Sequence, residues 1–171
     1  MQTIRDRVIE LRKVPANELI ENPKNWRKHP PSQRSAMAGV LGEIGLADAV
    51  IARETPEGLQ LIDGHLRQEM TPTEEVPVLI LDVNEGEADI LLASYDPITA
   101  MATEDGTALQ QLLSTINSSN DGLNTLLQDI NERYSASAVT EVENQTEAYY
   151  LDSPGALINH TVPVDESGQF Y

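Results

Sequence analysis

Residues 59–70 read Leu-Gln-Leu-Ile-Asp-Gly-His-Leu-Arg-Gln-Glu-Met, and this stretch decides the fold. The apolar run at 59–62 predicts a β-strand, and a short helix follows it to about Met70, before Pro72. Gly64 lies at the join, where a residue without a Cβ allows a tight turn. A strand that passes directly into a helix is typical of α/β domains, and a helix start presents unpaired backbone N–H groups that attract anions.

The polar residues of this turn are candidate site residues. Arg67 is placed to reach back as a bidentate phosphate partner, and the N–H groups after Gly64 would bind the same phosphate. His65 is suited to donate a hydrogen bond or shuttle a proton, and Asp63 to act as a base or hold a metal. Plain structural roles stay open, with Asp63 as the N-cap, His65 as an ordinary helix-start residue and Arg67 as a solvated side chain.

Hydrophobic periodicity extends the prediction in both directions from this turn. The predicted elements, in chain order, are a strand at 8–14, a helical turn at 16–20, a loop at 22–31, a helix capped by Ser32 and ended by Gly45, a hairpin of strands at 50–53 and 59–62, the helix to Met70, a strand at 76–83, a helix at 87–93, a break at Tyr95-Asp96-Pro97 with a short helix through Met101, and two amphipathic helices around Leu109–Ile116 and Leu123–Ile130. The segment 76–83 is the most apolar run, so it predicts the central strand.

A second candidate site lies in the loop at 22–29, which reads Asn-Pro-Lys-Asn-Trp-Arg-Lys-His. Its cationic side chains surround Trp26, the only tryptophan of the chain, and such a pattern suits phosphate pairing together with base stacking. The alternative is that Trp26 anchors the loop to the core while the charges face water. For Arg27 both interpretations stay open.

Composition restricts the class of protein. Of the 171 residues, 40% are hydrophobic and 23% are charged, which fits a globular chain. The absence of cysteine excludes disulfides and thiolate chemistry. His29, His65 and His160 lie in distant segments, so no metal site is expected from them. The charged N-terminus carries no signal sequence and no apolar run is long enough to cross a bilayer, so we expect a cytoplasmic protein without a membrane partner.

The net charge of −17 is unevenly distributed. Residues 1–38 hold eight Lys or Arg against four acids, whereas residues 39–171 hold three Arg against 24 acids. Such asymmetry can mark a local polyanion site, although an acidic surface that keeps the chain soluble is an equal alternative. The acidic bulk argues against tight non-specific DNA binding, which depends on neutralising many phosphates.

Together, the two candidate sites resemble the ParB N-terminal domain family, whose fold is shared with sulfiredoxin. The first box of the family, Leu-x-x-Asn-Pro-x-x-x-Arg, is matched by Leu19, Asn22, Pro23 and Arg27. The second box, an apolar strand followed by Gly-x-x-Arg at a helix start, is matched by Gly64 and Arg67. The order of the boxes and the Val-Pro-Val strand that follows them make the resemblance fairly specific, and it covers roughly residues 8–102.

The resemblance implies an α/β (α+β) fold, a small mixed sheet with flanking helices and a phosphate-recognising groove between the boxes. The site residues it implies are Asn22, Arg27, Gly64 and Arg67 for phosphate or nucleotide binding, and Asp63 and His65 as catalytic candidates. Relatives use this groove for CTP binding and hydrolysis, for small-molecule kinase chemistry or for proposed nuclease activity. The absence of cysteine excludes reductase chemistry, and the region 93–102 lacks the basic third box of partition-type members.

We therefore expect a ParB-like domain at 8–102, a helical extension at 103–134 and an acidic flexible tail or linker at 135–171. The expected function is binding of a nucleotide or of a DNA phosphate in DNA metabolism, with weak nuclease or NTPase activity and Mg²⁺ as the candidate cofactor. The alternative is a non-catalytic binding or regulatory module of a phage or mobile element, associated with DNA or with a DNA methyltransferase. The expected compartment is the cytoplasm of a bacterium or of a phage-infected cell, and the oligomeric state stays open.

Overall fold

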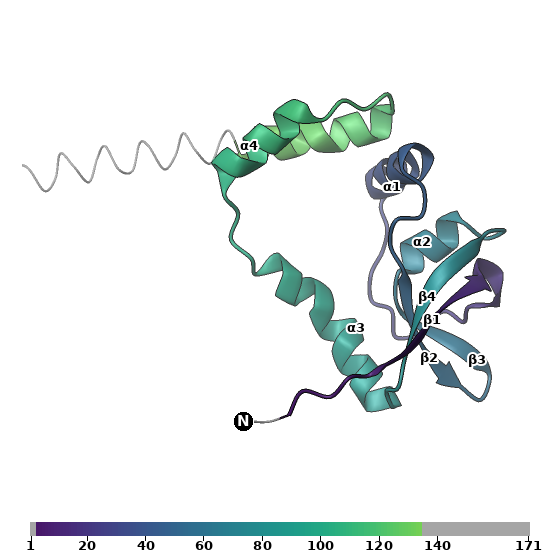
Figure 1. Ribbon diagram of the computed structural model, residues 1–171. Coiled ribbons are helices and arrows are strands. Elements are labelled where there is room, and N and C mark those ends of the chain that lie inside the picture. The colour runs from purple at the N-terminus through teal and green to yellow at the C-terminus, as the bar shows by residue number, and fades with distance from the viewer. Residues whose placement is uncertain (1–2, 135–171) are drawn as a thin grey trace, which may run out of the picture. The chain divides into compact units, whose positions relative to one another are not determined.

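The computed structural model describes residues 3–134, and Figure 1 shows their helices and strands. In chain order the elements are β1 (Val8–Pro15), a 3-10 turn η1 (Ala16–Glu18), α1 (Pro31–Glu43), β2 (Val50–Thr55), β3 (Gly58–Asp63), α2 (His65–Met70), β4 (Glu75–Leu81), α3 (Glu85–Ala100) and α4 (Gly106–Thr115). A further helical run follows at 121–134. The predicted tail at 135–171 lies outside the described residues.

The four strands form one mixed sheet in the order β1-β4-β2-β3. β2 and β3 make the predicted antiparallel hairpin, and β4 pairs antiparallel with β1 and parallel with β2. The most apolar strand of the sequence is therefore an interior strand of the sheet, as predicted. This arrangement confirms the expected fold class of a small mixed sheet with flanking helices.

The core lies on both faces of the sheet. Adjacent residues Leu61 and Ile62 belong to different apolar clusters, because successive side chains of a strand point to opposite faces. The larger cluster joins all four strands to η1 and consists of Val14, Ala16, Leu19, Val50, Ala52, Leu61, Val76, Val78 and Ile80. The smaller cluster, on the other face, consists of Ile62, Leu81 and Ala88, so α3 covers part of that face.

The start of α3 is fixed by hydrogen bonds of Glu87. The Asn84 side chain accepts from the Glu87 N–H at 3.0 Å, and the Glu87 carboxylate accepts from the Asn84 N–H at 2.9 Å, which forms a capping box. Arg7, which precedes β1, donates to both oxygens of the same carboxylate at 2.8 Å and 2.6 Å. Glu87 therefore connects the helix to the chain segment that leads into β1.

Two predicted helix boundaries were wrong. The expected break at Tyr95-Asp96-Pro97 does not occur, because one helix runs from Glu85 to Ala100 with Pro97 inside it. Ser32 is not the N-cap of α1, because that helix begins one residue earlier, at Pro31. A proline suits the first helical position, since the N–H that it lacks would have had no partner there. Gly45 follows the end of α1 with a φ of 91°, as predicted.

Contacts between residues group the chain into one compact unit at 1–129 and a second unit at 130–171. Of the second unit, the structure describes only the last residues of the helical run at 121–134. Within the compact unit, Glu43 of α1 accepts hydrogen bonds from the Ser118 hydroxyl at 2.6 Å and from the Ser119 N–H at 2.8 Å. The segment after α4 is therefore tied to α1, and the expected domain boundary near residue 102 stays a prediction. None of the described helices is long and apolar enough to cross a membrane.

The contact between Arg7 and Glu87 predicts a pH dependence of stability. The hydrogen bonds from Arg7 lower the pKa of Glu87 from 4.5 to about 2. A carboxyl group whose pKa is lower in the folded state stabilises the fold above its unfolded pKa, and this contribution is lost as the pH falls from about 4.5 toward 2. We expect Glu87→Gln to flatten the decrease in the free energy of unfolding over that interval, measured by urea denaturation at several pH values.

Glu57→Gln is the matched control, because Glu57 lies in the exposed turn between β2 and β3. It should leave the pH dependence as it is in the wild type. The same pH profile for wild type and Glu87→Gln would contradict the assigned role of Glu87.

Candidate functional site

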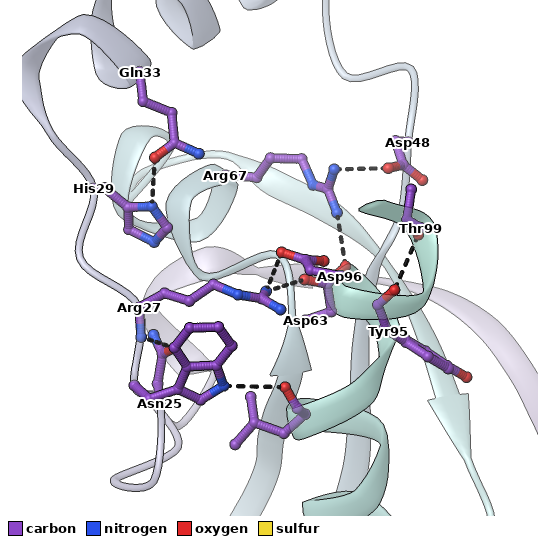
Figure 2. Close-up of polar contacts among 12 residues, drawn as sticks. Asn25, Arg27, His29, Gln33, Asp48, Asp63, Arg67, Tyr95, Asp96 and Thr99 are labelled. Carbon is purple, nitrogen blue, oxygen red and sulfur yellow. Dashed lines mark hydrogen bonds and ion pairs between the residues drawn. The ribbon is translucent and has the colours of Figure 1, made fainter. Parts of the chain in front are cut away.

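A cleft of about 210 Å³ lies where β3 ends and α2 begins. Its walls come from four parts of the chain: the loop after η1 (Asn25, Arg27, His29), α1 (Gln33, Met37), the β3–α2 join (Asp63, Gly64, His65, Leu66, Arg67) and α3 (Asp96). Figure 2 shows Arg27, Asp63, Asp96 and Arg67 gathered at this place. The cleft thus brings together the two segments that the sequence singled out.

Gly64 permits the close join between strand and helix. Its φ is 92°, in the left-handed region, where only glycine is free of strain. A Cβ built on Gly64 would lie 2.5 Å from Cγ1 of Val50, which is 1% exposed at the start of β2. Both constraints require glycine at this position in the lining of the cleft.

Arg27 enters the cleft from the loop. Its guanidinium lies 2.8 Å from Asp96 of α3 and 3.7 Å from Asp63 at the end of β3, and the side chain is 19% exposed. The guanidinium also lies over the ring of Trp26, at 5.1 Å from the ring centroid. Trp26 itself is more than half exposed and donates from its indole N–H to the Leu92 carbonyl at 3.4 Å. Trp26 therefore contacts α3 at one edge and keeps part of its ring open to solvent.

Arg67 enters from α2, on the other side of Asp63. It donates to the Asp48 carboxylate at 2.7 Å and to the Ala49 carbonyl at 3.2 Å, and it lies 3.8 Å from Asp63. Its side chain is 18% exposed, and its buried Nε has no hydrogen-bond partner among the described residues. Arg67 therefore has one N–H donor, at Nε, in addition to the Nη1 and Nη2 donors that bind Asp48 and Ala49.

The carboxylate of Asp63 lies between the two guanidinium groups, with one oxygen toward Arg27 and the other toward Arg67 (Figure 2). It does not cap α2, because the residue at the N-cap is Gly64. The charged residues lining the cleft are two arginines and the aspartates Asp63 and Asp96, so their formal charges cancel. An anion that enters the cleft must therefore compete with carboxylates for the arginines.

His65 is the most deeply buried polar group of the cleft, with 5% of its surface exposed. Burial lowers its pKa, and the nearby Asp63 carboxylate raises it by less, so the imidazole is neutral at pH 7. Its Nε2, like that of His29, has no hydrogen-bond partner among the described residues. A neutral imidazole with a free ring nitrogen is able to accept or donate a proton.

The loop before α1 runs along one face of α3. Lys24 binds Glu85 at 2.8 Å and Asp89 at 2.6 Å, Trp26 contacts Leu92, and Arg27 binds Asp96. The four helix positions are spaced by four, three and four residues, so they lie on one face of the helix. These contacts hold Arg27 at the cleft.

Asn22 lies at the start of the loop that carries Arg27. Its side chain is buried, and its Oδ1 accepts from the Lys24 N–H at 3.0 Å, so Asn22 forms a turn that starts the loop. Asn22 does not line the cleft. Asn22 therefore shapes the loop that carries Arg27, and its role as a phosphate ligand stays a prediction.

The other predicted site residues do line the cleft: Arg27, Asp63, Gly64, His65 and Arg67. Asp96 and Asp48, which bind the arginines, were not predicted as site residues. Asp96 was missed because the helix was expected to break there. On a continuous helix, its spacing of seven from Asp89 would have placed both carboxylates on the face that contacts the loop. The expectation that the dipole of α2 attracts anions has little weight, because the helix has six residues.

Gly64 provides a test of how the cleft is built. We expect Gly64→Ala to lower the free energy of unfolding by about 2 kcal/mol or more, because the new methyl group meets Val50 and the φ is unfavourable for alanine. Urea denaturation measures the effect. Gly42→Ala is the control, since a Cβ at Gly42 of α1 meets nothing within 4 Å, and it should be neutral or stabilising. Equal effects of the two substitutions would contradict the packing described.

Comparison with known proteins adds a similarity of fold. No family model matches the sequence, and no curated protein matches it. Among solved structures, the chain is similar to the C-terminally truncated chromosome-partitioning protein ParB from Caulobacter crescentus complexed with CTP-gamma-S, with 18% identity over 61% of this chain and 60% of that chain and a TM-score of 0.48. It is also similar to a Pnob8-like ParB-N domain, with 17% identity over 61% of this chain and 44% of that chain and a TM-score of 0.43.

A second structure of the Caulobacter crescentus protein, complexed to the centromeric parS site, has 13% identity over 68% of this chain and 64% of that chain and a TM-score of 0.42. The chain thus spans less than two thirds of the length of each of these three structures. All three structures are of ParB proteins, the family that the two boxes of the sequence resemble.

Proposed function

We propose that the cleft at the β3–α2 join binds a phosphate group, and that a nucleotide supplies it. The observation that carries this proposal is the placement of two largely buried arginines, Arg27 and Arg67, on the two sides of Asp63. A guanidinium presents a planar set of N–H donors that matches phosphate oxygens. Both guanidinium groups line one cleft of about 210 Å³, so they would donate hydrogen bonds to a bound phosphate from two sides.

Two of the carboxylates that bind the arginines, Asp96 and Asp48, are exposed enough to be displaced by a ligand. The side chains of Asp96 and Asp48 are 57% and 70% exposed, so both would be rehydrated at once on leaving an arginine. A doubly charged phosphate with more acceptor oxygens than a carboxylate is therefore an effective competitor for both arginines.

A nucleotide fits the charge of the chain better than a long DNA duplex. The cleft has no net charge, and residues 39–171 carry 21 more acids than bases, so a duplex would meet repulsion over most of its length. A single phosphate group or a DNA end contacts only the cleft. Trp26, which is more than half exposed beside Arg27, provides a face on which a base could stack.

The finer proposal is hydrolysis of the bound nucleotide or of a DNA phosphodiester, with His65 handling a proton. The neutral, buried imidazole is suited to accept a proton from water. Mg²⁺ is the candidate cofactor, since Asp63 and Asp96 supply the carboxylate oxygens that Mg²⁺ prefers when it also contacts phosphate. A phosphate that takes over the arginines would release both carboxylates for this role.

The second candidate function is a binding module without turnover. It is favoured by the position of Asp63, which lies between two arginines and is thereby held as an acceptor of their N–H groups. In that case nucleotide or DNA binding would regulate a partner, and a DNA methyltransferase stays the candidate protein partner. Turnover by the purified protein separates the two functions.

Arg67→Ala is the direct test of phosphate binding. Removal of a charged hydrogen-bond donor typically costs about 1.5–3 kcal/mol, so the affinity for a nucleoside triphosphate with Mg²⁺ should fall roughly tenfold to a hundredfold. Isothermal titration calorimetry measures it. Arg53→Ala is the matched control, because Arg53 of β2 binds Gln60 and does not line the cleft. Equal affinities of wild type and Arg67→Ala would overturn the proposal.

Turnover is measured on the same proteins by release of phosphate and by cleavage of single-stranded and duplex DNA with Mg²⁺. If the cleft is catalytic, His65→Gln should keep most of the affinity and lose the activity. Binding without turnover in the wild type would leave the binding module as the function.

Asp96→Asn tests the competition between carboxylate and phosphate. Measured without Mg²⁺, for which Asp96 is a proposed ligand, nucleotide binding should tighten about twofold to fivefold when the negative charge that holds Arg27 is lost, because the carboxylate removed is exposed. Glu104→Gln is the control, since Glu104 is exposed after α3 and does not line the cleft. Weaker binding by Asp96→Asn, with no change in Glu104→Gln, would show that Asp96 supports the ligand and would contradict the competition.

A further inference from the structure

We propose that the outer edge of β1 is a self-association surface, on which β1 of a second copy pairs antiparallel with Leu11 at the two-fold axis. The pairing would join two four-stranded sheets into one of eight strands. It involves the opposite end of the sheet order from β3, which leads into the cleft. It does not depend on the proposed function.

β1 is an edge strand of eight residues, paired on one side only, with β4. Its first six residues are exposed, and Leu11 is 64% exposed. An edge of this length presents a row of backbone N–H and C=O groups that pair readily with another strand. Within the described part of the chain, no other strand pairs with this edge.

The backbone geometry determines which residues face outward. The Ala16 N–H donates to Glu74 on the β4 side at 2.9 Å, and hydrogen-bonding groups alternate along a strand. Val14, Arg12 and Glu10 therefore direct their backbone groups to β4, whereas Lys13 and Leu11 direct theirs outward. The pairable segment is bounded by Pro15, which has no N–H, and by a bulge between Val8 and Glu10.

The charges of β1 select one register within that segment. With Leu11 at the axis, Leu11 faces Leu11 of the other copy and forms a hydrogen-bonded pair. Glu10 then lies opposite Arg12 of the other copy, in the non-hydrogen-bonded position where side chains are closest. An axis at Arg12 or Lys13 would place two like cations opposite each other, and an axis at Glu10 would place two carboxylates opposite each other. Only the Leu11 register pairs opposite charges.

Apolar contacts favour the same arrangement. Leu11 pairs with Leu79 of β4, and Leu79 lines an apolar groove between the sheet and α3 together with Val8, Ile51 and Ile90. Two exposed Leu11 side chains that meet across the axis would extend this apolar surface and withdraw both from water. In the monomer, Leu11 is 64% exposed, so most of its side chain stays in contact with water.

The distribution of charge favours an approach through β1. Each copy carries a net charge of −17, which opposes association in general. Residues 1–38, which include β1, are the part with an excess of basic residues, eight against four. Two copies therefore repel each other least when these segments meet.

A cysteine substitution at the axis tests the register in the full chain, which has no native cysteine. Leu11→Cys would place two thiols on residues whose Cα atoms are about 5.5 Å apart, which a disulfide or a short thiol crosslinker can bridge. Lys13→Cys is the matched control on the same face of the same strand. Its two copies would be offset by four residues, about 13 Å, and out of reach. We expect covalent dimers from Leu11→Cys and few from Lys13→Cys under oxidation.

Exchange of the charges supplies a second test, by sedimentation equilibrium, in which the wild type should show a concentration-dependent rise toward twice 18.8 kDa. Glu10→Lys and Arg12→Glu each replace two attractive cross-strand pairs with two repulsive ones, so the dissociation constant should rise about tenfold. The double variant Glu10→Lys/Arg12→Glu restores opposite charges and should restore association. Thermal unfolding of the dilute monomers separates this effect from a loss of fold.

A wild type that stays monomeric at every concentration would overturn the proposal. So would a dimer that neither crosslinks through Leu11→Cys nor responds to the charge exchange, because it would form through another surface. Nucleotide binding is measured separately through Arg67→Ala, so failure of one proposal is distinguishable from failure of the other.

Discussion

The cleft depends on the contact between the loop at 24–27 and one face of α3. Lys24 binds Glu85 and Asp89, and Arg27 binds Asp96, so ion pairs follow the helix over most of its length. The two pairs of Lys24 lie at the surface and contribute little alone, but together with the Arg27 pair they fix the path of a loop with almost no regular structure of its own. Without that path, Arg27 would not face Asp63 and Arg67, and the two candidate segments of the sequence would not meet at one cleft.

Burial of the two arginines requires carboxylates in the cleft. A guanidinium that is four-fifths buried needs a partner for its charge, and Asp63, Asp96 and Asp48 supply it in the structure. The same carboxylates reduce the positive potential that a phosphate would meet. A ligand of the cleft would have to replace these carboxylates, so the proposed phosphate, with its higher charge and additional oxygens, would compete better than a substrate carboxylate.

Local sequence patterns predicted most of the fold and about half of the cleft. The apolar run at 76–83 predicted an interior strand, and Gly64 predicted the tight join, because both depend on neighbouring residues. The contacts of Asp96 and Asp48 with the arginines could not be predicted in this way, since 69 residues separate Arg27 from Asp96 and only the folded sheet brings them together. Asn22 lies in the same loop as Arg27, but its side chain forms a turn and does not line the cleft, a difference that the local sequence does not specify.

The helix break predicted at Tyr95-Asp96-Pro97 does not occur, and the contact that keeps the helix continuous is the same contact that forms one wall of the cleft. A proline disfavours helical geometry for the residue before it, and its missing N–H weakens the helix, so a break at 95–97 is the expected local structure. That preceding residue is Asp96, whose carboxylate binds Arg27 at 2.8 Å. Tertiary contacts hold Asp96 in the helix against its local preference, and Thr99 adds a hydrogen bond from its hydroxyl to the Tyr95 carbonyl. Local preferences of the sequence are most often overruled at functional sites. At Asp96, the residue of α3 that lines the cleft, the helix therefore depends on tertiary contacts more than on local sequence.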